Sequence, residues 1–95
     1  MQREAVLKSL SAHKQEFSDK YGVTRLGIFG SVARGQASSA SDVDVIVEMP
    51  PDLFQMVHMK EELEQILDAP VDLIRHTKYL SAYLQSRIDN EAIYV

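Results

Sequence analysis

Two aspartates inside an apolar run constrain this chain more than any other feature of its sequence. Residues 42–48 read DVDVIVE, and the valines and isoleucine are typical of a buried β-strand. On a strand, Asp42 and Asp44 share one face, with Cα atoms roughly 6.5 Å apart. Carboxylates are rarely buried alone, because removing a charge from water is costly. Something must therefore pair with these two carboxylates.

The rest of the chain is predicted to alternate between helices and short strands. Apolar residues recur at helical spacing over 2–21, and Gly22 is a natural end for that helix. Asp52 suits the N-cap of a second long helix. The first half is expected to contain a helix over 2–21, a strand over 24–29, a short helical turn over 31–34, a polar turn over 36–41 and a strand over 42–48. A helix over 53–67, a strand over 71–75 and a helix over 77–90 are expected to follow. The tail 91–95 is expected as a loose end, as a short segment that docks on a partner or a second copy, or as a structural part of its own chain.

Two helices are predicted to turn apolar stripes toward a core. On the helix over 53–67 the stripe comprises Leu53, Phe54, Met56, Val57, Leu63, Ile66 and Leu67. On the last helix it comprises Tyr79, Leu80, Tyr83, Leu84 and Ile88.

The connections between the strands indicate the fold class. A helical crossover joins the second and third strands, which favours a parallel, right-handed arrangement. The first and second strands can pair antiparallel across their short connection. The fold class is therefore predicted as α/β (α+β), a small mixed sheet with helices packed against it. The length of 95 residues suits one domain over 1–95.

Composition and charge restrict the compartment and the partners. The chain has no cysteine, so it can form neither a disulfide nor a thiolate metal site. No apolar run approaches the roughly 18 residues of a membrane span, and the polar N-terminus is unlike a signal peptide, so a cytoplasmic protein is expected. The net charge of −4, with scattered lysines and arginines, disfavours polynucleotide binding. A small anionic ligand held through a metal, and a homo- or hetero-oligomer, remain open.

Asp72 adds a third carboxylate, again inside an apolar run. If the second and third strands are neighbours, Asp72 lies beside Asp44 on the same face. Converging carboxylates repel one another, and a divalent cation is the usual remedy. Oxygen ligands suit Mg²⁺, with Mn²⁺ as the alternative. A pair of such ions can clamp the attacking and leaving oxygens of an in-line phosphoryl displacement.

Gly30 and Ser31 follow the first strand and suggest a phosphate-binding segment. Glycine lets a ligand approach the backbone, and free amides at a helix start attract phosphate. Arg34 could add a charged fork. Each piece alone also has an ordinary structural interpretation, as a turn, a solvated arginine or a capping carboxylate. Together they predict a site for a nucleoside triphosphate with metal.

The spacing of these residues resembles a known signature. A Gly-Ser-x-x-Arg-Gly segment, five further residues and Ser-Asp-x-Asp are typical of the nucleotidyltransferase superfamily related to DNA polymerase beta. Its smallest branch, the minimal nucleotidyltransferases, has about this length, and residues 71–74 resemble the third acidic strand of that branch. The matching motif residues are Gly30, Ser31, Arg34, Gly35, Ser41, Asp42 and Asp44.

The resemblance implies a role for most of these residues. Asp42 and Asp44 would bind two Mg²⁺ ions, and Asp72 would complete the second metal site and help deprotonate the attacking hydroxyl. Gly30 and Ser31 would hold the triphosphate of ATP, with Arg34 among the nucleotide-binding residues but without a defined task.

The resemblance also implies a reaction and a partner. The expected reaction is transfer of AMP from ATP to a hydroxyl, with release of pyrophosphate. Minimal nucleotidyltransferases of the MntA type are antitoxins of HEPN/MNT modules, in which a tyrosine of the HEPN-domain ribonuclease toxin receives AMP. Two alternatives stay open: a non-catalytic module that covers the toxin, and a nucleotidyltransferase subunit that acts on a small molecule. The presence of all three carboxylates favours an enzyme.

Overall fold

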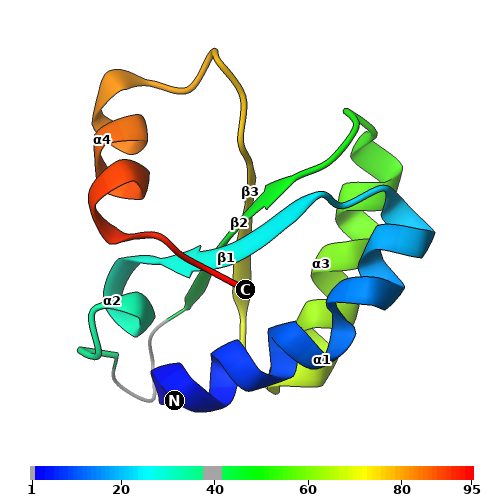
Figure 1. Cartoon of the computed structure of the whole chain (residues 1–95), viewed down its shortest axis with the longest axis horizontal. Helices are drawn as coiled ribbons and strands as arrows, with labels where there is room; N and C mark the ends of the chain where they lie inside the picture. Colours follow the sequence, from blue (N-terminus) through cyan, green and yellow to red (C-terminus); the bar gives the residue numbers. More distant parts are fainter. Residues whose placement is uncertain (1, 38–41) are drawn as a thin grey trace.

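The computed structural model describes residues 2–37 and 42–95, arranged around a four-stranded sheet (Figure 1). The elements in chain order are α1 (Arg3–Tyr21), β1 (Arg25–Phe29), α2 (Gly30–Ala33), β2 (Val43–Glu48), α3 (Leu53–Leu67), β3 (Val71–Arg75), α4 (Ala82–Glu91) and β4 (Ile93–Tyr94). The predicted turn over 36–41 includes residues 38–41, which lie outside the described residues. Among the residues described, no helix is both long and apolar enough to cross a membrane.

The sheet is mixed, with strand order β3–β2–β1–β4. β1 pairs antiparallel with β2, and β2 pairs parallel with β3, which confirms both predicted pairings. The helix α3 forms the crossover that a parallel pair requires. β2 is therefore a central strand with neighbours on both sides, which explains its almost continuous apolar run.

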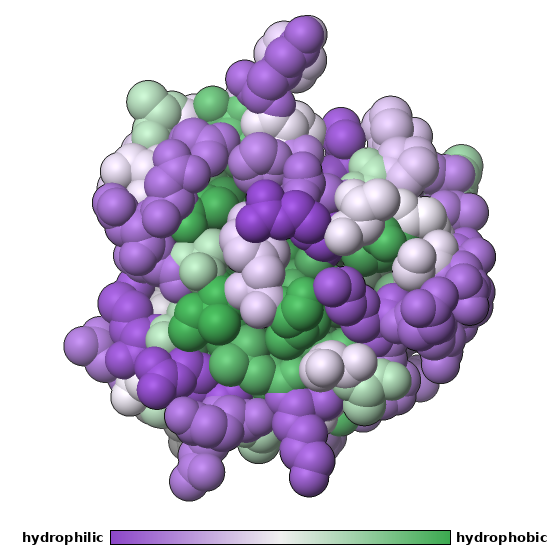
Figure 2. Space-filling model, viewed as in Figure 1, coloured by the Kyte–Doolittle hydropathy of each residue, from purple (hydrophilic) through white to green (hydrophobic). Residues whose placement is uncertain are grey.

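The tail forms a fourth strand, which the sequence did not predict. β4 pairs antiparallel with β1, and the Val95 amide donates a hydrogen bond of 2.9 Å to the Leu26 carbonyl. Gly27 permits this approach, because a Cβ there would lie 2.9 Å from Cδ1 of Tyr94. Apolar side chains gather around this end of the chain, ringed by polar ones (Figure 2). The tail is thus not a loose end, and its pairing within the sheet confirms a structural role in its own chain.

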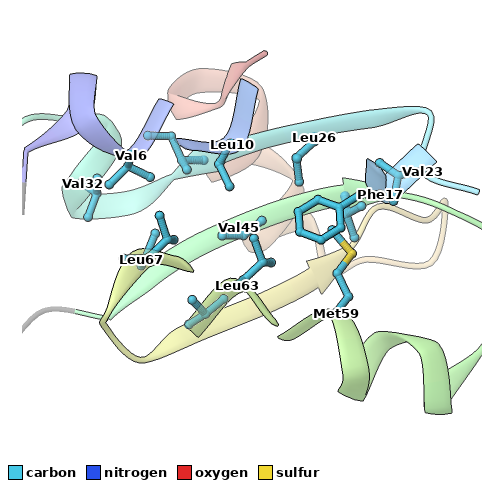
Figure 3. Close-up of a cluster of buried hydrophobic side chains, with 14 of the residues drawn as sticks. Val6, Leu10, Phe17, Val23, Leu26, Val32, Val45, Met59, Leu63 and Leu67 are labelled. Atoms are coloured by element: carbon cyan, nitrogen blue, oxygen red, sulfur yellow. The ribbon is translucent and has the colours of Figure 1, made fainter. Parts of the chain in front are cut away.

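The main core lies between the sheet and the helices α1 and α3 (Figure 3). Alternation along β2 directs Val43, Val45 and Val47 into this core. Its members include Val6, Leu10, Phe17, Leu26, Met59 and Leu63, all at most 1% exposed. Both predicted helix ends are confirmed: Gly22 ends α1 in the left-handed region, and the Asp52 carboxylate caps α3 by accepting a bond of 3.1 Å from the Gln55 amide.

The other face of the sheet carries the predicted carboxylates and is covered by α4. Phe29, Ile46 and Ile88 form a second, smaller core there. Asp44 is two residues before Ile46 on β2, so its side chain points to this same face. Figure 1 shows α4 on this side and α1 and α3 on the opposite side, with α2 at the end of β1. Val32 and Ala33 of α2 belong to the main core. The expected site therefore faces α4.

The last helix begins later than predicted, at Ala82 instead of Thr77. The Thr77 hydroxyl accepts a hydrogen bond of 3.0 Å from the Tyr79 amide, a local turn that competes with helix formation. Ser81 then caps the helix by accepting a bond of 3.2 Å from the Leu84 amide. Tyr79 and Tyr83 were predicted in the apolar stripe, but they are 83% and 74% exposed.

The apolar stripe predicted for α3 is wrong in its first turn. Leu53 and Phe54 are 74% and 80% exposed, and Val57 is also exposed. Burial on α3 begins with Met59 and continues through Leu63. Leu53 and Val57 instead line an open hollow together with Leu73 of the edge strand β3.

Candidate active site

The parallel pairing of β2 and β3 places Asp44 beside Asp72. The two residues are register partners, so their side chains point to the same face of the sheet, as predicted. Asp42 is exposed and directly precedes β2. Asp44 is half-buried, whereas Asp72 is exposed on an edge strand. The structure thus brings the three predicted carboxylates to one end of the sheet.

The neighbouring carboxylates make the Asp44 carboxyl harder to ionise. Burial raises the pKa of the Asp44 carboxyl above its ordinary value, and the neighbouring charge of Asp72 raises it further. Arg87 of α4 opposes the rise in this pKa, and the carboxylates of Asp42 and Glu91 add to it. A cation bound here would relieve this repulsion.

The donors fit a divalent cation in kind. Asp42, Asp44 and Asp72 offer carboxylate oxygens, the ligand type that Mg²⁺ and Mn²⁺ prefer. Within residues 2–37 and 42–95, however, no three acidic, histidine or cysteine side chains converge closely enough to hold a metal ion. The fit therefore rests on donor type and on the mutual repulsion at Asp44, and not on completed coordination.

Gly30 brings the backbone between β1 and α2 close to this cluster. It is buried and has a φ of +74°, a conformation that side chains rarely adopt. A Cβ on this residue would collide with Oδ2 of Asp44. A side chain here would displace the Asp44 carboxylate, so this position favours glycine. Gly30 and Ser31 begin α2 beside Asp44, and their binding of phosphate stays a prediction.

A fourth acidic residue, Glu91 of α4, lies in the site without having been predicted. Its Oε1 accepts a hydrogen bond of 3.0 Å from the Gly30 amide and another of 2.9 Å from Nη1 of Arg34. Nη2 of Arg87 lies 3.6 Å from the same oxygen. Arg34, which was predicted to contact phosphate, thus pairs with a carboxylate of its own chain. Helical spacing indicates that Arg87 and Glu91 share a face of α4, but not that this face meets Gly30.

Arg87 of α4 is a second arginine beside Glu91 and Gly30. Its guanidinium lies 5.5 Å from the ring centroid of Phe29 and 5.9 Å from that of Tyr83. Nη2 would be 3.4 Å from a Cβ on Gly30. Arg87 therefore lies against the same part of the backbone as Asp44, held between two aromatic rings and the Glu91 carboxylate.

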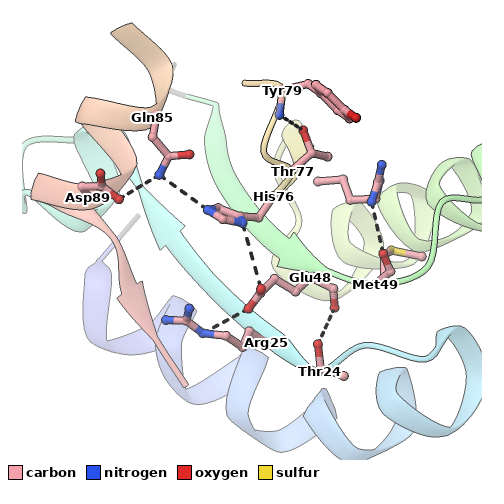
Figure 4. Close-up of polar contacts among 10 residues, drawn as sticks. Thr24, Arg25, Glu48, Met49, His76, Thr77, Tyr79, Gln85 and Asp89 are labelled. Carbon is pink, nitrogen blue, oxygen red and sulfur yellow. Dashed lines mark hydrogen bonds and ion pairs between the residues drawn. The ribbon is translucent and has the colours of Figure 1, made fainter. Parts of the chain in front are cut away.

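A separate polar network ties α4 to the opposite end of the sheet (Figure 4). Nδ1 of His76 lies 4.0 Å from Oε1 of Glu48, and its Nε2 lies 3.5 Å from Nε2 of Gln85. Arg25 pairs with the other oxygen of Glu48 at 3.3 Å. His76 follows the last residue of β3, whereas Asp72 is near its first, so this network positions α4 and lies away from the carboxylates.

This fold and this site together define a nucleotidyltransferase. The family model for the nucleotidyltransferase domain matches residues 10–95. The chain belongs to this family and is an enzyme of the nucleotidyltransferase class. Its four-stranded mixed sheet with covering helices is the fold of the minimal nucleotidyltransferases.

Three similar proteins illustrate the relationship. The protein adenylyltransferase MntA of Thermococcus cleftensis is 35% identical over 94 residues, which cover 97% of this chain and 94% of the relative. A solved chain described as a candidate minimal nucleotidyltransferase has a TM-score of 0.77 and 30% identity, covering 98% of this chain and 95% of its own. A chain from the complex of the tri-AMPylated Shewanella oneidensis HEPN toxin with its MNT antitoxin has a TM-score of 0.65, with 19% identity and coverage of 99% and 71%. At that identity the likeness shows the fold alone.

Proposed function

We propose that residues 1–95 act as one domain that transfers AMP from ATP to a tyrosine hydroxyl of a HEPN-domain toxin, and so serve as its antitoxin. The observation that carries this proposal is the pairing of Asp44 with Asp72 beside the Gly30 amide. The similarity to the Thermococcus adenylyltransferase supports AMP transfer to a protein. The fold shared with an MNT antitoxin that accompanies a HEPN toxin supports the type of partner.

The three carboxylates would have different roles in the reaction. Asp42 and Asp44 would hold two Mg²⁺ ions, and Asp72 would complete the second metal site. When bound, the ions neutralise charge on the triphosphate and on the reacting oxygens. The acceptor oxygen bonds to the α-phosphorus, the bond to the leaving pyrophosphate breaks, and Asp72 accepts the hydroxyl proton.

The exposure of the carboxylates suits an acceptor carried by another protein. Asp72 lies exposed on the edge strand β3, where a side chain of a partner can approach it. The elements that follow β3 are committed to the fold, since Ile88 of α4 is buried and β4 pairs with β1.

The test is AMP transfer from labelled ATP and Mg²⁺ to the product of the neighbouring gene, followed by mass spectrometry. The wild-type chain should add AMP to a tyrosine, and EDTA should abolish the transfer. The variants Asp42→Asn and Asp44→Asn should lose transfer while still binding the partner. Asp89→Asn is a matched control, because it removes one carboxylate from the exposed side of α4.

Each other result points to a different function. A tight complex without transfer would support a non-catalytic antitoxin that only covers the toxin. Transfer to a small molecule in place of the protein would support a subunit of a small-molecule nucleotidyltransferase. If the Asp44→Asn protein still transfers AMP, the assignment of the carboxylates is wrong.

A further inference from the structure

The groups around Glu91 resemble an anion-binding site, and the Glu91 carboxylate is the anion bound in it. One carboxylate oxygen receives the Gly30 amide at 3.0 Å and Arg34 Nη1 at 2.9 Å, with Arg87 Nη2 at 3.6 Å. We call these three donors the cradle. Two guanidinium groups and a backbone amide aimed at one point form the donor set that proteins use for phosphate oxygens.

The position of the cradle links it to the reaction. The Gly30 backbone is in contact with Asp44, because a Cβ on Gly30 would collide with Oδ2 of that residue. The Gly30 backbone therefore lies between the cradle and the Asp44 carboxylate. A nucleotide bound beside Asp44 would bring its phosphate oxygens to the place where the Glu91 carboxylate now lies. Both anions cannot occupy this place, because like charges repel and the donors are already used.

We propose that Arg34, Arg87 and the Gly30 amide bind the phosphates of the nucleotide, and that Glu91 occupies this cradle in the free protein, so that the triphosphate binds by displacing the Glu91 carboxylate. This inference rests on the proposed use of ATP. It assigns a binding role to Arg87 and a competing role to Glu91.

Displacement of Glu91 requires little rearrangement. Glu91 is the last residue of α4, and the chain leaves the helix at Ala92. The Ala92 amide still donates to the Ile88 carbonyl at 2.9 Å, so a rotation of the Glu91 side chain leaves the backbone bonds of the helix intact. A triphosphate carries several negative charges against the single charge of a carboxylate, and therefore competes effectively for the two arginines.

The variant Glu91→Gln should strengthen phosphate binding. The amide has the same size but lacks the charge that holds the arginines. The Arg34 side chain is 39% exposed, so its interaction with a charged partner is weakened by solvent. We therefore expect Glu91→Gln to bind tripolyphosphate about three- to tenfold more tightly than wild type. The probe is inorganic tripolyphosphate with Mg²⁺, measured by calorimetry, so that binding is observed without group transfer. Asp89→Asn, which removes the same charge from α4 outside the cradle, should leave the affinity unchanged.

Arginine variants in the Glu91→Gln background separate phosphate binding from a merely structural role. If Arg87 only holds Glu91 in place, Arg87→Gln has no effect once that carboxylate is gone. If Arg87 binds phosphate, the Glu91→Gln/Arg87→Gln protein should bind tripolyphosphate at least about tenfold more weakly than Glu91→Gln alone, and Arg34→Gln should act in the same direction. Should Glu91→Gln not fold, Glu91→Asp, which withdraws the carboxylate by one methylene, should also strengthen binding.

Two outcomes would overturn the inference: unchanged or weaker tripolyphosphate binding by Glu91→Gln, and no effect of Arg87→Gln in that background. These outcomes are distinct from failure of the proposed function. Tighter binding by Glu91→Gln in a chain that transfers no AMP would support the cradle and refute the transferase. AMP transfer by the wild type, together with unchanged tripolyphosphate binding by Glu91→Gln, would support the transferase and refute the cradle.

Discussion

Replacing Gly30 with alanine should both destabilise the fold and displace Asp44. The φ of +74° costs an L-residue roughly 1–2 kcal/mol. The new Cβ would also collide with Oδ2 of Asp44 and lie 3.1 Å from its Cγ, and overpacking of this kind costs about 1–3 kcal/mol. Because the obstacle is the end of a short side chain and not backbone, the carboxylate can move aside, and a total of about 2–3 kcal/mol is expected.

Gly35 provides a matched control for the backbone strain. Its φ is +73°, and a Cβ there would meet no heavy atom of the described residues within 4 Å. Gly35→Ala should therefore cost only about 1 kcal/mol. For a domain of this size these values correspond to a fall in Tm of roughly 4–8 °C for Gly35→Ala and roughly 10–20 °C for Gly30→Ala, measured by thermal denaturation followed by circular dichroism.

A second substitution tests whether the collision with Asp44 causes the difference. Asp44→Ala removes the colliding carboxylate, so in the Gly30→Ala background it should restore the stability lost beyond that of Gly35→Ala. Gly30→Ala should also fail to transfer AMP, since the carboxylate proposed to bind metal has moved. Equal Tm values for Gly30→Ala and Gly35→Ala, or no recovery in the double variant, would refute the close approach of Gly30 to Asp44.

Three further predictions concern stability and the placement of α4. Burial and Asp72 raise the pKa of Asp44 in the folded state, so ionisation of Asp44 weakens the fold as the pH rises through that raised value. Asp44→Asn should therefore have a higher Tm than wild type at neutral pH. In a series of melting curves across pH, this gain should vanish below the ordinary aspartate pKa of about 4. Ile88→Ala should lower the free energy of unfolding by about 2–4 kcal/mol in denaturant titrations, since Ile88 is 2% exposed in the small core under α4. Asp52→Ala should cost about 1 kcal/mol through loss of the α3 cap without affecting AMP transfer, and a loss of transfer would show that α3 contributes to the site.

The sequence by itself was sufficient for the three strands β1, β2 and β3 and for the face on which the carboxylates lie. The alternation of DVDVIVE determines that Asp44 lies on the face opposite Val43 and Val45, because side chains on a strand alternate with period two. The crossover helix favours a parallel pairing of β2 and β3, and the observed register places Asp72 beside Asp44. Gly30 was identifiable because it ends an apolar strand and precedes Ser31 in a recognisable spacing.

Tertiary structure alone decided what α4 brings to the site. Glu91 contacts Gly30 and Arg34 across 61 and 57 positions of the sequence, and these contacts depend on how α4 crosses the sheet. Local periodicity reports which residues share a face of a helix, but it contains no information on what that face meets. The exposed first turn of α3 and the pairing of β4 with β1 eluded prediction for the same reason, since burial and strand pairing are set by distant segments.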